Sequence, residues 1–175
     1  TCVEICVKPS AGTPSATQFA VGLLAQGSVT AGKEIPAPPY SAPTVGARNE
    51  VEAASKVGIQ RDPNRPVNND PAYIRAELEG TLQRLGVDYI DLYYLHRRDE
   101  TVPLEDAIGT LVDLMKEGKI GGYGLSEVAP YTLRLAQDIH PCLAVQSEYS
   151  LWTRQPELGM IQACRELGVA FVPFS

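Results

Sequence analysis

The sequence predicts an incomplete parallel α/β barrel. After residue 47, short apolar runs alternate with amphipathic helical patterns, and the segments that connect them are short. This order implies right-handed crossovers and a parallel sheet, which leaves either a barrel or a doubly wound open sheet. No G-x-G-x-x-G or G-x-x-x-x-G-K-[ST] motif follows any of the runs, so the barrel is favoured. About five of the eight strands that close such a barrel are legible, and both ends are missing or divergent.

Composition indicates an ordinary globular domain. The chain has 175 residues, of which 44% are hydrophobic and 21% charged, enough to bury a core. A formal net charge of -6 argues against a nucleic-acid partner, because such partners require a basic surface. No apolar run approaches the roughly 20 residues that span a bilayer, and the N-terminus lacks a signal-like segment. We therefore expect a cytoplasmic protein with no membrane contact and a small-molecule or protein partner.

Residues 1–47 form an unassigned segment that is rich in Ala, Pro, Ser, Thr and Gly. The prolines of residues 35–43 exclude a helix or a central strand there. Two apolar runs, Val3–Val7 and Phe19–Ala25, are each compatible with a strand or a helical turn. The barrel is predicted to occupy residues 48–175.

The four cysteines show no paired C-x-x-C spacing, so no metal site is expected. Cys2 and Cys6 are four residues apart, and a disulfide or metal clip there is a minor alternative. Cys142 and Cys164 lie in apolar surroundings, which predicts buried free thiols.

The first elements of residues 48–175 have clear boundaries. A strand is predicted at Val51–Val57. Asp70 as the N-cap and Pro71 at the first helical position predict a helix that ends at Gly86. The next run, Tyr89–Leu95, is apolar apart from Asp91, as expected of a strand that is covered on both faces.

The same alternation continues to the end of the chain. The remaining elements are a helix from Pro103 to Gly118, a strand at 122–125, a helix at 130–139, a strand at 143–147, a helix at 156–167 and a strand at 169–173.

Polar side chains lie at or just after the carboxyl ends of most of the predicted strands. In a β/α barrel the chemistry lies at the carboxyl ends of the strands, so these residues are expected to converge on one rim. Each of them alone would pass as a surface, turn or structural residue, and their joint occurrence at consecutive strand ends outweighs that interpretation. They are Lys56, His96, Ser126 with Glu127, Gln146 and Ser175.

Four sequence blocks carry a family resemblance: 51–58 (VEAASKVG), 89–97 (YIDLYYLHR), 124–127 (GLSE) and 146–154 (QSEYSLWTR). In order and spacing they resemble the aldo-keto reductases, in their plant and bacterial branch, over about residues 48–175. The resemblance implies a (β/α)8 TIM barrel. It also implies reduction of a small-molecule carbonyl compound by hydride from NADPH.

The resemblance assigns two catalytic roles. Lys56 corresponds to the lysine that lowers the pKa of a tyrosine acid, and His96 to the imidazole that orients the carbonyl oxygen or shares its proton. Such donors are needed because hydride addition leaves negative charge on the oxygen.

The resemblance also assigns binding roles. Ser126 and Gln146 correspond to residues that hold the nicotinamide carboxamide. Phe174 corresponds to the aromatic residue that stacks on the ring, and Ser175 to the start of a cofactor loop.

The substrate pocket is less clearly marked. Arg97 is close enough to the rim to touch substrate, although a solvated loop at 97–99 with local ion pairs is the simpler expectation. Trp152 is expected either to line the pocket or to pack in the structure.

The sequence also departs from the family. The block D-T-A-x-x-Y-G, which carries the catalytic Asp and Tyr, is absent, and Tyr40 lacks the Asp and Gly that flank the family's tyrosine. The chain also stops at Ser175, before the family's pyrophosphate loop and eighth strand.

Three hypotheses result. The chain is a fragment or divergent reductase with weak or no activity, or a non-catalytic module that self-associates through open strand edges. Alternatively, residues 1–47 supply the missing strands.

Overall fold

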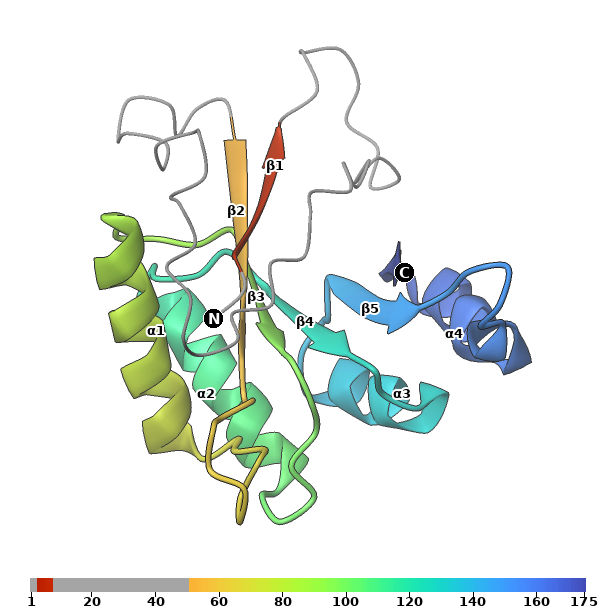
Figure 1. Ribbon diagram of the computed structural model, residues 1–175, viewed down its shortest axis with the longest axis horizontal. Helices are drawn as coiled ribbons and strands as arrows, with labels where there is room; N and C mark the ends of the chain where they lie inside the picture. Colours follow the sequence, from red (N-terminus) through yellow and green to blue (C-terminus); the bar gives the residue numbers. More distant parts are fainter. Residues whose placement is uncertain (1–2, 8–50) are drawn as a thin grey trace.

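The computed structural model describes residues 3–7 and 51–175, which form one six-stranded sheet flanked by helices (Figure 1). Strands β2 to β6 pair in parallel, each with its neighbour in the sequence. The elements in chain order are β1 (Val3–Val7), β2 (Val51–Val57), α1 (Pro71–Leu85), β3 (Leu92–Leu95), α2 (Leu104–Lys116), β4 (Tyr123–Ser126), α3 (Pro130–Ile139), β5 (Ala144–Glu148), η2 (Gln155–Leu158), α4 (Met160–Leu167) and β6 (Ala170–Phe174).

The described sheet is an open part of a barrel, because its first and last strands do not pair with each other. The prediction of about five parallel strands in an incomplete barrel is confirmed. The early run Val3–Val7 is a strand, and it pairs antiparallel with β2, from Val3 opposite Ser55 to Val7 opposite Val51. A strand of a parallel barrel would run the other way.

Three sequence expectations lie outside the described residues: the run Phe19–Ala25, the role of Tyr40, and a clip between the side chains of Cys2 and Cys6. Within residues 3–7 and 51–175, no helix is long and apolar enough to cross a membrane.

The predicted boundaries of α1 are confirmed by its caps. The Asp70 carboxylate accepts a hydrogen bond from the Ala72 N–H at 2.9 Å. Gly86 ends the helix with a φ of 66°, a left-handed conformation that glycine adopts without steric cost, and its N–H donates to the Gln83 carbonyl.

One predicted helix is wrong: residues 156–167 do not form a single element. The segment divides into the short 3-10 turn η2 and helix α4, and Gly159 lies between them. The φ of Gly159 is 147°, far from the helical value of about −63°, so an α-helix cannot continue through it.

Strand β3 is also shorter than the predicted run Tyr89–Leu95. Before Leu92, a side chain takes part in the hydrogen bonding between β2 and β3 in place of a backbone carbonyl. The Asp91 carboxylate accepts the Ala53 N–H at 2.8 Å.

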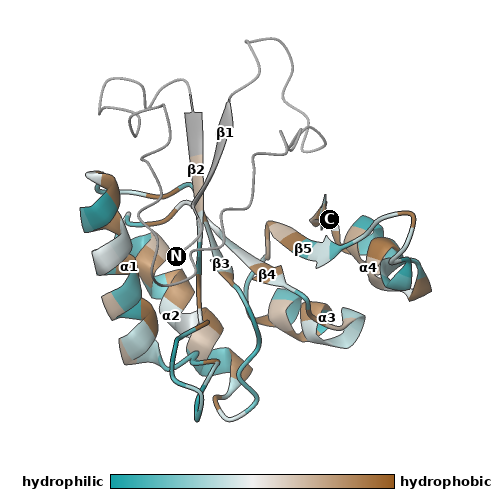
Figure 2. Ribbon diagram, in the orientation of Figure 1, coloured by the Kyte–Doolittle hydropathy of each residue, from teal (hydrophilic) through white to brown (hydrophobic). Residues whose placement is uncertain are grey.

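The hydrophobic core lies between the sheet and its helices. Because alternate side chains of a strand point to opposite faces, one set of strand residues meets α1 to α4. Figure 2 shows hydrophilic colour along the outer side of α1. The largest fully buried members of this core are Tyr93, Tyr123, Ile74, Leu78, Ile90, Leu95, Ile108, Leu111, Leu114, Ile120, Leu125 and Leu133.

The other set of strand residues lines the inner face of the sheet, where Tyr94, Ala144 and Val172 form a smaller cluster. This face carries the candidate site described below.

Pro173 lies within β6, where a proline would normally break a ladder. The N–H of Ala170 donates to Leu143, and the carbonyl of Phe174 accepts from Tyr149, so these β6 residues bond towards β5. The alternation of a parallel ladder leaves the backbone of Phe171 and Pro173 facing the free edge. The missing N–H of Pro173 therefore removes a donor from the open edge of the sheet and from no existing pair.

The Tyr94 ring packs directly over Gly124 on the neighbouring strand. A Cβ atom at Gly124 would lie 2.4 Å from Tyr94 Cε1 and 3.0 Å from the Ala144 carbonyl oxygen. This close approach requires glycine at position 124.

We predict that Gly124→Ala destabilises the fold by roughly 1–3 kcal/mol, because the added methyl group must displace the Tyr94 ring. Gly109 in α2 has no heavy atom within 4 Å of the position that a methyl group would occupy, so Gly109→Ala serves as the matched control. It should be neutral or stabilise by up to about 1 kcal/mol through helix propensity. Urea unfolding monitored by circular dichroism measures both, and equal effects would contradict the packing argument.

Candidate active site

The parallel register arranges the inner face of the sheet in rows. One row runs from Lys56 on β2 through Tyr94 and Gly124 to Ala144 and Ala170. Residues two positions further along share the same face and lie closer to the carboxyl ends of the strands.

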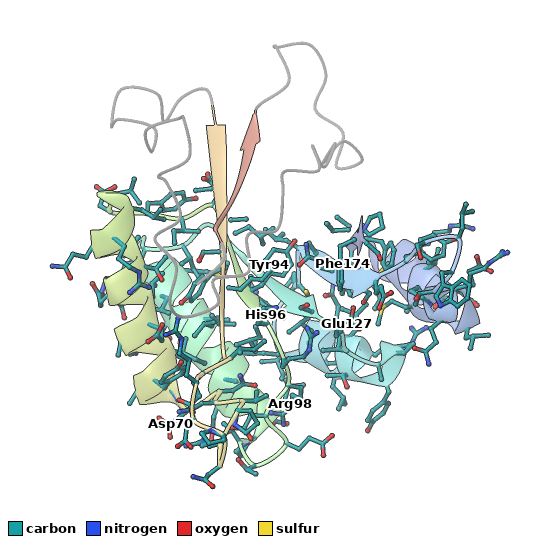
Figure 3. The ribbon with its side chains drawn as sticks, in the orientation of Figure 1. Asp70, Tyr94, His96, Arg98, Glu127 and Phe174 are labelled. Atoms are coloured by element: carbon teal, nitrogen blue, oxygen red, sulfur yellow. The ribbon has the colours of Figure 1, made fainter. Side chains whose placement is uncertain are left out.

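The next row contains Ser126, Gln146 and Val172, which are partners in register. His96 follows Tyr94 by two residues and extends β3 into this row, since its N–H donates to the Val57 carbonyl at 2.8 Å. Figure 3 shows Tyr94 and His96 beside β3 on the side of the sheet away from α2. The two predicted catalytic residues, Lys56 and His96, therefore share one face on adjacent strands.

Ser126 and Gln146 lie side by side and are both buried, with exposed fractions of 1% and 4%. A hydroxyl and a carboxamide each offer a donor and an acceptor, which is what the amide of a nicotinamide requires. Phe174 stands on β6 opposite Glu148. By alternation it shares the inner face with Gln146, because Phe171 packs on the helix side against Tyr149 with ring centroids 5.9 Å apart. The nicotinamide-binding role that the resemblance implies for Ser126, Gln146 and Phe174 stays a prediction.

Arg97 joins the ends of β3 and β4. Its Nη1 donates to the His96 carbonyl at 2.8 Å and to Ser126 Oγ at 3.3 Å. The guanidinium group thus lies in the row that contains His96 and Ser126.

The environment of Asp99 differs from the expected one. The prediction of a solvated loop is wrong at this residue, which is only 6% exposed. Its carboxylate accepts from Thr101 Oγ1 at 2.6 Å, from the Thr101 N–H at 3.0 Å and from Arg65 Nη2 at 3.2 Å. The Asn69 N–H also donates to it, at 3.4 Å, and the Asp99 N–H donates to Asn69 Oδ1 at 2.7 Å.

These four residues, Arg65, Asn69, Asp99 and Thr101, form what we call the rim clamp. Burial opposes the charge of the Asp99 carboxylate, yet the hydrogen bonds from Thr101, Arg65 and Asn69 together hold its pKa below the ordinary value. The clamp joins the β2–α1 loop to the β3–α2 loop, and so connects the strand ends that carry the predicted catalytic residues.

Gly58 makes room for the clamp. Its φ is 111°, and a Cβ there would lie 2.8 Å from Asn69 Nδ2. Sequence reasoning missed the clamp, because Arg65 and Asp99 are 34 residues apart and Asp99 follows two arginines that suggested local pairing.

Glu127 connects β4 to β5. It is a non-glycine residue with a φ of 53°, a conformation that costs about 1–2 kcal/mol. Its carboxylate accepts the Glu148 N–H at 2.6 Å, and its own N–H donates to the Gln146 carbonyl at 2.9 Å. These two hydrogen bonds hold the strand ends that carry Ser126 and Gln146 side by side, and they offset the cost of the Glu127 backbone conformation.

Two further predicted residues, Trp152 and Ser175, follow the carboxyl ends of β5 and β6. Trp152 is 94% exposed, so the alternative that it packs in the structure is wrong, and its pocket role stays a prediction. Ser175 follows β6 and is exposed, and its cofactor role also stays a prediction. Among residues 51–175, no group of three or more His, Cys, Asp or Glu side chains converges to hold a metal ion.

The fold and the site together define a class: β/α-barrel proteins whose polar residues gather at the carboxyl ends of parallel strands. The aldo/keto reductase family model matches residues 25–175, and the chain belongs to that family.

A known relative supports the same family assignment. A curated probable aldo-keto reductase from Glycine max is 47% identical over 130 residues, which are 73% of this chain and 38% of that protein. The chain therefore spans about two fifths of the length of this relative.

Solved structures show the same partial match. A glycerol dehydrogenase from Gluconobacter oxydans has a TM-score of 0.63 at 26% identity, over 69% of this chain and 38% of its own. The holo form of an aldo-keto reductase from Bacillus halodurans has a TM-score of 0.61 at 30% identity, over 69% and 41%. A thermostable aldo-keto reductase in complex with the inhibitor epalrestat has a TM-score of 0.63 at 30% identity, over 70% and 43%.

We predict that Asp99→Asn destabilises the fold by roughly 1–3 kcal/mol, because it removes the ion pair and the charge-assisted bonds of the rim clamp. Asp113→Asn is the matched control, since Asp113 is exposed on α2 and its ion pairs are at the surface. It should change stability little.

The effect of Asp99→Asn should depend on pH. Because the folded pKa is lowered, the stability from Asp99 is complete above the ordinary carboxyl pKa of about 3.9 and is lost as the pH falls through the folded value. Urea titrations from pH 3 to pH 7 test this, and a difference that grows on acidification would contradict it.

Proposed function

We propose that these residues contribute the lysine and histidine half of an NADPH-dependent carbonyl reductase site. The observation that carries the proposal is the shared inner face on which Lys56, His96, Ser126 and Gln146 occupy adjacent rows. When bound, NADPH supplies hydride to the carbonyl carbon of a small-molecule substrate.

The side chains would act on the oxygen and on the cofactor ring. His96 orients the carbonyl oxygen and donates to it, while the Lys56 ammonium group favours the negative charge that develops there. Ser126 and Gln146 hold the carboxamide of the nicotinamide, and Phe174 covers its ring.

The family's proton donor has no counterpart in this sequence. No D-T-A-x-x-Y-G block is present, so the catalytic Asp and Tyr are not identified. We infer that a polypeptide of these 175 residues alone turns over weakly or not at all.

Two of the four cysteines, Cys142 and Cys164, support a cytosolic location. Burial raises the pKa of Cys142 to about 12 and that of Cys164 to about 11, and both thiols are free. Unpaired buried thiols are typical of reducing compartments.

Cofactor binding is tested by titrating NADPH fluorescence. Gln146→Ala should weaken binding about tenfold, because it removes a buried partner of the carboxamide. Gln162→Ala is the matched control, since Gln162 is a residue of α4 whose side chain bonds to Glu166, away from the inner face. Equal affinities for the two variants would sink the assignment of Gln146.

The same samples test turnover. NADPH oxidation with a small aldehyde should stay near background for the 175-residue polypeptide. Clear oxidation that Lys56→Met abolishes would contradict the inferred inactivity while supporting the role of Lys56.

A second candidate function is a non-catalytic module that assembles through its open edges. The observation that favours it is the unpaired end of the described sheet at β6. Light scattering from 5 to 200 µM should then show a dimer whose fraction rises with concentration. A monodisperse monomer throughout would exclude this candidate.

A further inference from the structure

Arg97 is a cation at the site without a carboxylate partner among residues 51–175. Both of its hydrogen bonds come from Nη1, to the His96 carbonyl and to Ser126 Oγ, and both acceptors are uncharged. Within the same range, no carboxylate lies within ion-pair distance of this half-buried guanidinium group.

Three carboxylates at the neighbouring strand ends have other partners. Asp99 turns into the rim clamp and pairs with Arg65. Glu127 accepts the Glu148 N–H, and Glu148 accepts from Thr153 Oγ1 at 2.7 Å. Four other arginines do form ion pairs: Arg65, Arg75, Arg134 and Arg154.

The geometry leaves part of the guanidinium group available. With Nη1 held by two strand ends, Nε and Nη2 make no bond within residues 51–175. A planar guanidinium fork matches a carboxylate, and a fixed fork loses little freedom when it binds one.

We propose that Arg97 anchors the carboxylate of an acidic carbonyl substrate, so that the site selects oxo acids and acidic aldehydes over neutral carbonyl compounds. This proposal rests on the proposed reductase function. It favours a substrate carboxylate over a cofactor phosphate because Arg97 contacts His96 and Ser126, which are assigned to the carbonyl and the nicotinamide amide. In NADPH a ribose separates the phosphates from the nicotinamide ring.

The two histidines of the chain provide a binding assay that does not need cofactor. The imidazole proton signals are assigned with His140→Gln, and the His96 signal is followed during titration. The probes are 4-(hydroxymethyl)benzoate and its uncharged methyl ester, the alcohols that would form from the corresponding aldehydes.

The acid should bind the unmodified chain about tenfold more tightly than the ester, as expected for a charge-assisted pair. Arg97→Gln should remove most of this preference, and Arg97→Lys should retain part of it. Arg61→Gln is the control for net charge, since Arg61 is exposed in the β2–α1 loop, and it should keep the preference.

Several results would overturn the proposal. They are equal affinities for acid and ester, no shift of the His96 signal with either, a preference that survives in Arg97→Gln, or Arg97-dependent binding of inorganic pyrophosphate that is tighter than that of the acid. The comparison of acid and ester on the unmodified chain does not depend on whether a variant folds.

The assay also separates this proposal from the reductase function. Because no NADPH is present, an Arg97-dependent acid preference without cofactor binding would reject the reductase function and keep the carboxylate anchor. Cofactor binding without an acid preference would do the reverse.

Discussion

The alternation of side chains along parallel strands is the constraint on which the other features of this molecule depend. It sends Val57, Leu95 and Leu125 to the helices and leaves Lys56, His96 and Ser126 on the inner face. A shift of one residue in β2 would exchange the two sets, burying the charge of Lys56 against the helices and exposing core side chains. The fold is stable only in the register that also assembles the candidate site.

The polar contacts at the strand ends add a second level of order. The rim clamp links β2 to β3, Arg97 links β3 to β4, and Glu127 links β4 to β5. Each link joins the ends of two neighbouring strands, beyond the last backbone hydrogen bonds that pair those strands. Charged side chains therefore hold the residues that the proposed reaction requires. Arg97 both links two strand ends and, in the proposal above, offers its guanidinium group to a substrate carboxylate.

Local signals in the sequence predicted most elements. Asp70 with Pro71 and Gly86 marked both ends of α1, and Pro130 marked the start of α3, because caps and prolines act within a few residues. The division of the last predicted helix at Gly159 was missed, since glycine within a helical pattern only weakens the pattern. The antiparallel pairing of β1 was also missed, because strand direction depends on partners distant in sequence.

The family, the parallel α/β architecture and the positions of Lys56, His96, Ser126 and Gln146 could be predicted from the residue pattern. Each of these four side chains lies at or just after the end of a recognisable strand pattern. The pairing of charges between distant loops depends on how the chain folds. Asp99 follows Arg97 and Arg98 in the chain, yet its charge is satisfied by Arg65, 34 residues earlier. Local i,i+3 pairs such as Lys116 with Asp113 follow from sequence spacing. A pair between two loops, such as Arg65 with Asp99, depends on which loops meet in space.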